Sequence, residues 1–122
     1  MASTPTPLPL ALSACCSPVT GGELSEEAAA TLARVFKALG DPTRVRLVSL
    51  IAASPDAEAC ICDLTAPVGL AQPTVSHHMK LLADAGLVTR TQRGRWAYYR
   101  IVPEALAAAA RALAPVEIAT SA

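Results

Sequence analysis

Hydrophobic residues recur every three to four positions along most of the chain, which is the spacing of helices that bury one face. Ser25 and Asp41 can cap the first two helices, and Gly40 ends the first of them. Arg44 and Arg46 are expected on the solvated face of the second helix. The pattern predicts helices over about residues 26–39, 42–52, 58–68, 72–85 and 104–113.

The period changes from helical to alternating after Gly86. Residues 87–92 and 96–102 are rich in β-branched and aromatic side chains, and they flank Arg93-Gly94-Arg95, which predicts a β-hairpin. The predicted order is four helices, two strands and a last helix (α-α-α-α-β-β-α). Two short helices joined by a tight turn and followed by a hairpin form a winged helix-turn-helix, a mainly α fold with a small β wing.

The predicted helix over 72–85 has one apolar and one polar face. Val75 and Met79 lie on the apolar face together with His78, which we expect to be packed and hydrogen-bonded. The adjacent His77 points about 100° away on a helix, so the two histidines are not expected to chelate one ion.

Composition indicates one small domain with a loosely held flank. The 122 residues are 52% hydrophobic but only 3% aromatic, so the core is expected to contain closely packed helices. A domain this small that buries little aromatic area is expected to gain stability from oligomerisation. Residues 1–22, with four prolines, predict a flexible arm ahead of a folded domain over 23–114 and a tail over 115–122. The composition excludes a membrane span, and no basic residue precedes Arg34, so we expect a cytoplasmic protein without a secretory signal.

Three segments carry a recognisable signature, namely FKALGDPTR at 36–44, QPTVSHHMK at 72–80 and AGLV at 85–88. Together they resemble the ArsR/SmtB family of metal-sensing repressors, over about residues 25–113. The resemblance implies a homodimer through the first and last helices, and a repressor that binds operator DNA when metal-free and leaves it when the ion binds. The alanine-rich helix over 104–113 suits such an interface because small side chains let helices approach closely.

The charge distribution independently favours double-stranded DNA as the partner. The formal net charge is zero, yet residues 74–111 carry six basic and two acidic side chains. One departure from the family is Ala71, where a Ser or similar cap usually precedes the Gln; losing it costs about 1 kcal/mol. The side chains expected to reach bases or phosphates are Gln72, Thr74, Ser76, His77 and Lys80 on the helix and Arg93 and Arg95 on the wing.

The segment EACICDL at 58–64 resembles the family's sensing motif, a Cys-x-Cys followed by Asp-Leu. Cys60 and Cys62 would point about 200° apart on a regular helix, so Cys60 is expected in a frayed first turn if both thiolates face one ion. A third ligand then has to come from Cys15 or Cys16 on the arm, of the same or the other protomer.

The ion follows from the donor set. An all-thiolate site selects soft ions; three thiolates match As(III) or Sb(III), whereas four match tetrahedral Cd(II), Pb(II) or Zn(II). We expect arsenite, held by Cys60 and Cys62 with Cys15 or Cys16, and a Cd(II)/Pb(II) sensor that uses all four cysteines is the alternative. The last helix lacks the Asp and His ligands of zinc-sensing relatives, so no second site is expected.

Two other functions fit less well. A thiol redox sensor would pair Cys15 or Cys16 with Cys60 or Cys62 in a disulfide and release DNA under oxidant. A thiol-dependent enzyme is disfavoured, because the sequence has no Cys-x-x-Cys on a βαβ pattern, no Gly-rich phosphate loop and no clustered acid-base pair. We therefore expect neither catalysis nor a small organic substrate.

Overall fold

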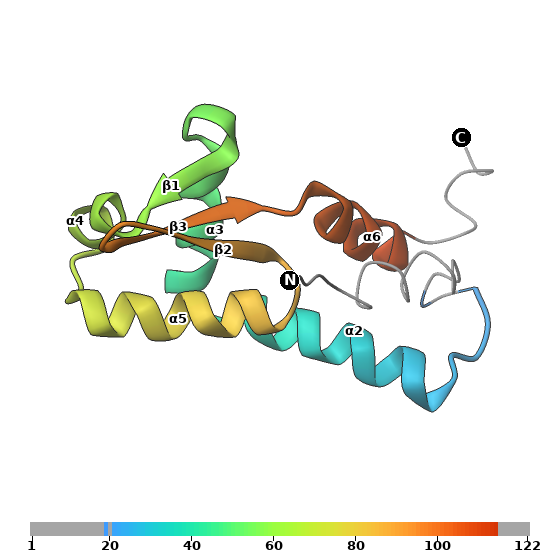
Figure 1. The fold of residues 1–122 in the computed structure, drawn as a ribbon. Helices are drawn as coiled ribbons and strands as arrows, with labels where there is room; N and C mark the ends of the chain where they lie inside the picture. Colours follow the sequence, from blue (N-terminus) through green and yellow to red (C-terminus); the bar gives the residue numbers. More distant parts are fainter. Residues whose placement is uncertain (1–18, 20, 115–122) are drawn as a thin grey trace.

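The elements follow the expected order with one addition. The structure is a computed structural model that describes residue 19 and residues 21–114 (Figure 1). Its α-helices are α2 Glu26–Leu39, α3 Pro42–Ala52, α4 Thr65–Val68, α5 Gln72–Asp84 and α6 Pro103–Leu113. Its strands are β1 Glu58–Cys60, β2 Val88–Arg93 and β3 Trp96–Ile101, and the short 3-10 helices η1 Pro55–Ala57 and η2 Ile61–Asp63 flank β1. The five helices and the β2–β3 hairpin confirm the predicted winged helix-turn-helix, and β1 is the addition.

The first two helices begin at the predicted capping residues. Ser25 Oγ accepts a hydrogen bond from the Ala28 amide at 3.1 Å. An Asp41 carboxylate oxygen accepts one from the Thr43 amide at 2.9 Å, and Pro42 occupies the first helical position. Each bond satisfies an amide that has no partner within its own helix, which is why these residues fix where α2 and α3 start.

Arg44 joins three helices, so the expectation that it is solvated is wrong. Its Nε donates to the Ala38 carbonyl at 2.6 Å and its Nη2 to the Lys37 carbonyl at 3.4 Å, both at the end of α2. Its Nη1 lies 3.0 Å from His78 Nδ1 on α5. The last carbonyls of a helix lack intrahelical partners and favour a cation, which draws the guanidinium inward. His78 is half-buried and hydrogen-bonded, in agreement with its predicted packed role.

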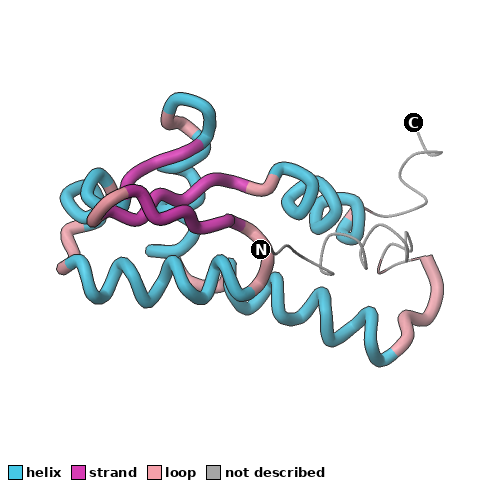
Figure 2. The backbone as a smooth tube through the Cα atoms, viewed as in Figure 1, coloured by secondary structure: helices cyan, strands magenta, loops and turns pink. Residues whose placement is uncertain are grey.

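The core forms where α3 and α5 pack against the sheet and where α2 packs against these two helices (Figure 2). Its largest fully buried side chains are Leu47, Ile51, Leu64, Met79, Leu82, Leu87, Val35 and Val75. Helix α6 contributes four buried alanines, Ala105, Ala108, Ala109 and Ala112. No polar or charged residue is buried in the part of the chain that the structure describes. The apolar stripes read from the sequence are thus the faces that pack together.

The expectation of one continuous helix over 58–68 is wrong in its first half. Residues 58–60 form β1, which pairs antiparallel with β3 and gives a three-stranded sheet in the order β1-β3-β2. Asp56 and Ala57 have φ values of 59° and 52°, and this left-handed backbone immediately precedes β1. Pairing with β3 gives the backbone groups of β1 hydrogen-bond partners and buries Ala59 and Cys60. This stabilisation outweighs the helical preference of the segment, which is weak because the apolar run is so short.

Candidate nucleic-acid interface and thiol site

Helix α5 presents the side chains predicted to read DNA. Gln72, Thr74, His77 and Lys80 are exposed and Ser76 is half-buried, whereas Val75, Met79 and Leu82 are buried beneath them. The helix starts at Ala71, whose side chain makes no capping bond. The Thr74 amide instead donates to the Ala71 carbonyl at 3.1 Å. The sequence prediction that this helix lacks a side-chain cap is therefore confirmed.

The hairpin turn places Arg95 at the tip of the wing. The two strands are joined by Gly94 and Arg95, and Gly94 has a φ of +63°, which glycine adopts without the strain of a side chain. Arg95 is exposed. It also lines the cleft between the wing and α5.

A cleft of about 500 Å³ separates α5 from the wing. Its polar and charged lining comes from Gln72, Ser76, Lys80 and Asp84 on α5 and from Arg90, Gln92 and Arg95 on the wing. Three basic side chains thus face one carboxylate. Such a surface attracts the phosphates of a duplex that contacts helix and wing together.

Arg90 and Gln92 are the residues that sequence reasoning missed. They alternate along β2 with Thr91 and Arg93, so they point to the face that looks toward α5. Arg90 Nη2 donates to Gln92 Oε1 at 2.6 Å, and Gln92 Nε2 donates to the Gly94 carbonyl at 3.1 Å. The period-two pattern of the strand was the signal that separates them from Arg93.

Lys80 is paired within its own helix. Its Nζ lies 2.9 Å from an Asp84 carboxylate oxygen, and both side chains are well exposed. Exposed ion pairs of this kind contribute about 0.3–0.5 kcal/mol. Lys80 can therefore exchange Asp84 for a phosphate at little cost.

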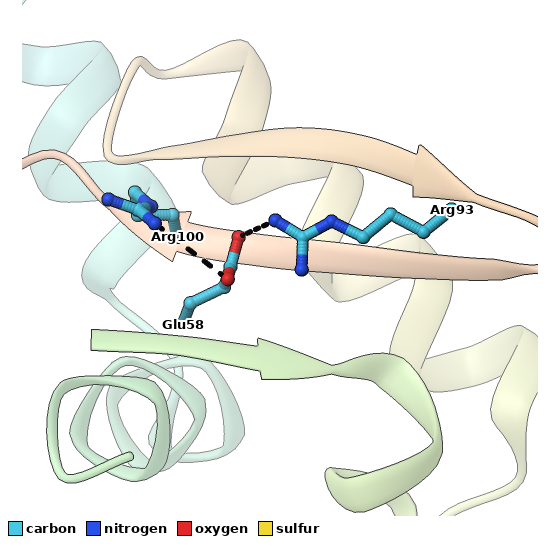
Figure 3. A network of polar contacts seen from close by, with 3 residues as sticks. All are labelled: Glu58, Arg93 and Arg100. Carbon is cyan, nitrogen blue, oxygen red and sulfur yellow. Dashed lines mark hydrogen bonds and ion pairs between the residues drawn. The ribbon is translucent and has the colours of Figure 1, made fainter. Parts of the chain in front are cut away.

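Arg93 lies on the opposite face of the wing from the cleft, against β1. Its Nη2 is 2.7 Å from a Glu58 carboxylate oxygen (Figure 3). Its guanidinium carbon lies 4.4 Å from the centre of the Tyr98 ring, a cation–π contact. Arg93 and Arg95, which sequence reasoning placed together at the hairpin tip, thus have different surroundings.

Cys60 and Cys62 meet at the junction of β1 and η2. The structure joins them by a disulfide, with their Cα atoms 5.2 Å apart. The Cys62 amide donates to Cys60 Sγ at 3.2 Å. Cys60 is buried, with 4% exposed, whereas Cys62 is exposed. Because the chain turns here from a strand into a 3-10 helix, the expected 200° separation of a regular helix does not apply, and both sulfurs can face one ion.

Cys60 and Cys62 supply two of the sulfur ligands of the predicted ion site. Two thiols brought together suit a thiophilic ion such as As(III) or Cd(II). Within residue 19 and residues 21–114, no group of three or more His, Cys, Asp or Glu residues is arranged to hold a metal. Cys15 and Cys16, the remaining candidate ligands, lie outside the described residues. The sequence prediction of a third thiolate from the arm is therefore still a prediction.

The thiol segment contacts α5, the helix predicted to read DNA. Helix η2 packs against α5 and β3. Ile61, between the two cysteines, is 2% exposed and lines the cleft between α5 and the wing. A change at the two sulfurs thus has a short packed path to the cleft between α5 and the wing.

A helix-turn-helix followed by a basic wing is the architecture of a DNA-binding transcriptional regulator, a class of regulatory proteins and not of enzymes. The family described as "Bacterial regulatory protein, arsR family" matches residues 41–90. The chain is 44% identical over 86 residues to the putative arsenical resistance operon repressor ArsR2 of Halobacterium salinarum, which covers 70% of each chain. The protein belongs to the ArsR family.

Other relatives differ in the ion that their names carry. The arsenic resistance transcriptional regulator ArsR1 of Pseudomonas putida is 44% identical over 70 residues, covering 57% of this chain and 53% of that protein. A cadmium resistance transcriptional regulatory protein CadC homolog of Staphylococcus aureus is 33% identical over 82 residues, covering 67% and 66%. The match thus spans little more than half the length of one relative and about two thirds of another.

The fold has solved counterparts. One is the homodimeric winged helix-turn-helix DNA-binding domain of a possible ArsR-family transcriptional regulator from Mycobacterium bovis. It aligns with a TM-score of 0.57 and 30% identity, covering 80% of this chain and 87% of that one. Among the described residues, no helix is long and apolar enough to cross a membrane.

Proposed function

We propose that this protein is a cytoplasmic repressor that occupies operator DNA as a metal-free homodimer and leaves it when arsenite binds its cysteine thiolates. The observation that carries the proposal is the meeting of Cys60 and Cys62 beside the helix that reads DNA. Helices α2 and α6 form the proposed dimer interface, and residues 1–22 form the proposed arm.

The thiol pair supports ion sensing because it is well placed to move the DNA-reading surface. Once reduced, Cys60 and Cys62 supply two thiolates, and the arm supplies the third from Cys15 or Cys16. Ligation would fix η2, and with it Ile61 on the wall of the cleft. An ion that binds one arrangement of this segment more tightly than another shifts the protein toward that arrangement.

The proposed DNA surface combines α5 with the face of the wing that lines the cleft. Exposed polar side chains of α5 are directed to the major groove, and Arg90, Gln92 and Arg95 to the adjacent backbone. The homodimer would present two such surfaces, and their spacing would set the separation of the two operator half-sites.

Arsenite, or Sb(III), is the proposed inducer because one arm thiolate added to the pair completes a three-sulfur set. Relatives named for arsenic resistance support this choice. A relative named for cadmium resistance keeps Cd(II) or Pb(II), bound by all four cysteines, as the alternative.

The test is fluorescence anisotropy of a labelled duplex from upstream of the protein's own gene, in reducing buffer without dithiols. The metal-free protein should bind with a Kd of roughly 10⁻⁸ M or tighter. Near-stoichiometric arsenite should release the duplex while cadmium, titrated in a parallel cell, should not. Release by cadmium or lead alone would replace the arsenite proposal by the four-cysteine alternative. No release by any of these ions would refute ion sensing.

Thiol oxidation is a second candidate, favoured by the Cys60–Cys62 disulfide itself. Two thiols and one hydrogen peroxide would give the disulfide and two waters. This pairing differs from the arm-to-segment disulfide expected from the sequence. Peroxide-induced release of the duplex in metal-free buffer, reversed by dithiothreitol, would support oxidation as the signal, and unchanged binding would exclude it.

A further inference from the structure

Glu58 connects the thiol segment to the wing. Its carboxylate oxygens lie 2.7 Å from Arg93 Nη2 and 3.8 Å from Arg100 Nη2 (Figure 3). The Glu58 side chain is only 15% exposed, against 49% for Arg93. A carboxylate shielded in this way is screened less by water and salt than one in an ordinary surface pair.

The Arg93 side chain crosses a whole strand to reach Glu58. The sheet order is β1-β3-β2, so β3 lies between the strand of Arg93 and the strand of Glu58. On the way, the guanidinium rests over the Tyr98 ring. Tyr98 is the cross-strand partner of Cys60, and Glu58 lies two residues before Cys60 on the same strand. Arg93 is thus held by Glu58 and by Tyr98, both of which have fixed positions relative to Cys60 in the sheet.

We propose that Glu58 is a positioning residue that controls, through Arg93, how strongly the wing holds DNA, and that thiol ligation at Cys60 and Cys62 acts on DNA partly through it. The ion-dependent half of this inference rests on the proposed function. The ion-independent half, competition between Glu58 and DNA for Arg93, does not.

The competition has a simple electrostatic basis. While Arg93 is paired with Glu58, its charge is compensated and attracts phosphate weakly. Arg93 is the last residue of β2, beside the turn at the tip of the wing, so once freed from Glu58 its side chain can reach a phosphate from that side of the tip. Each such contact steepens the dependence of log affinity on log salt by about 0.9. The salt dependence of DNA affinity therefore reports whether Arg93 is paired with Glu58 or with a phosphate.

Ligation of the two cysteines strengthens the hold of Glu58 on Arg93. An ion shared by Cys60 and Cys62 ties the end of β1 to η2, and Glu58, two residues earlier on β1, is then held in register with β3. Without the ion the end of β1 can yield, and Arg93 is more available to a phosphate. The pair therefore favours DNA release in the ion-bound state.

The experiment compares Glu58→Gln with Glu23→Gln, which makes the same charge change at an exposed position outside the helices and strands. Full-length proteins are titrated into a labelled duplex at several salt concentrations, with and without sodium arsenite, after circular dichroism has shown that each is folded. Arg93→Gln, alone and combined with Glu58→Gln, completes the cycle and approaches the pair from its other side.

Without arsenite, Glu58→Gln should bind DNA about three- to tenfold more tightly than Glu23→Gln, with a salt slope steeper by about one. The gain should vanish when Arg93 is also replaced by Gln. With arsenite, the fold-loss of affinity should be smaller for Glu58→Gln than for the wild-type protein.

Two results would overturn the inference, and the first of them does not depend on the outcome for the proposed function. An affinity and salt slope equal to those of Glu23→Gln, or a gain that persists without Arg93, would exclude the competition. An arsenite effect of the same size in Glu58→Gln and the wild type would exclude the coupling. Should arsenite leave the wild-type complex intact, the proposed function fails, while the ion-free cycle still decides whether Glu58 and DNA compete for Arg93.

Discussion

Helix α5, which we propose reads DNA, should become more stable when Ala71, the residue just before its first turn, is given a capping side chain. Ala71 has φ −70° and ψ 154°, nearly the backbone of Ser25 at φ −68° and ψ 160°, where a serine does cap α2. Ser25 accepts from the amide three residues later, and the equivalent amide at the start of α5 belongs to Thr74. Because Pro73 carries no amide hydrogen, Thr74 is the available donor. The Ala71→Ser change should therefore stabilise the protein by about 1 kcal/mol.

Urea unfolding followed by circular dichroism at fixed protein concentration measures this gain. In a thermal scan, about 1 kcal/mol corresponds to a rise in Tm of roughly 4–8 °C for a domain of this size. Ser25→Ala should lose a similar amount at the other helix, and Ala71→Val, which adds bulk without an acceptor, should gain nothing. A loss in Ser25→Ala without a gain in Ala71→Ser would show that the similar backbone angles do not make the two starts equivalent.

Three further substitutions test the contacts and the turn that hold α5 and the wing in place, and each is measured by urea unfolding. Arg44→Ala should cost about 1.5–3 kcal/mol, because the charged hydrogen bonds that join α2 to α5 are lost; a cost below 0.5 would mean that Arg44 is effectively solvated. Leu47→Ala should cost about 2–5 kcal/mol, since Leu47 is fully buried, and a smaller value would indicate a core that collapses around the gap. Gly94→Ala should cost about 1–2 kcal/mol from its φ of +63° alone, as an added Cβ meets nothing within 4 Å; an unchanged stability would show that the turn relaxes.

The helices were predictable because local and long-range signals agree in them. Ser25 and Asp41 satisfy orphan amides, and the apolar residues of α2, α3 and α5 repeat at the helical period, so the same positions both start the helices and bury them. The hairpin was equally readable, because alternation and a glycine turn coincide at Gly94.

The thiol segment was not predictable because its conformation is decided by distant residues. Three residues, 58–60, carry too little pattern to separate strand from helix, and it is the edge of β3 that makes them a strand. The position of Arg93 has the same origin, since Glu58 is 35 residues away in sequence. The candidate DNA residues of α5 followed from helical spacing. Strand alternation alone separates Arg90 from Arg93, but which of the two faces looks toward α5 is decided by the packing of the sheet.

The most direct test of the central claim is arsenite-induced release of DNA from Cys62→Ser protein, measured by anisotropy beside the wild type. Cys62 is the sharper position because it is exposed, so serine should leave the fold and metal-free DNA binding intact. Cys60→Ser, at the buried partner, should behave alike once its folding has been verified. Our account predicts wild-type affinity for the duplex and no release by arsenite in either variant. Wild-type release from both variants, or loss of DNA binding by the metal-free Cys62→Ser protein, would contradict a sensing role for this pair.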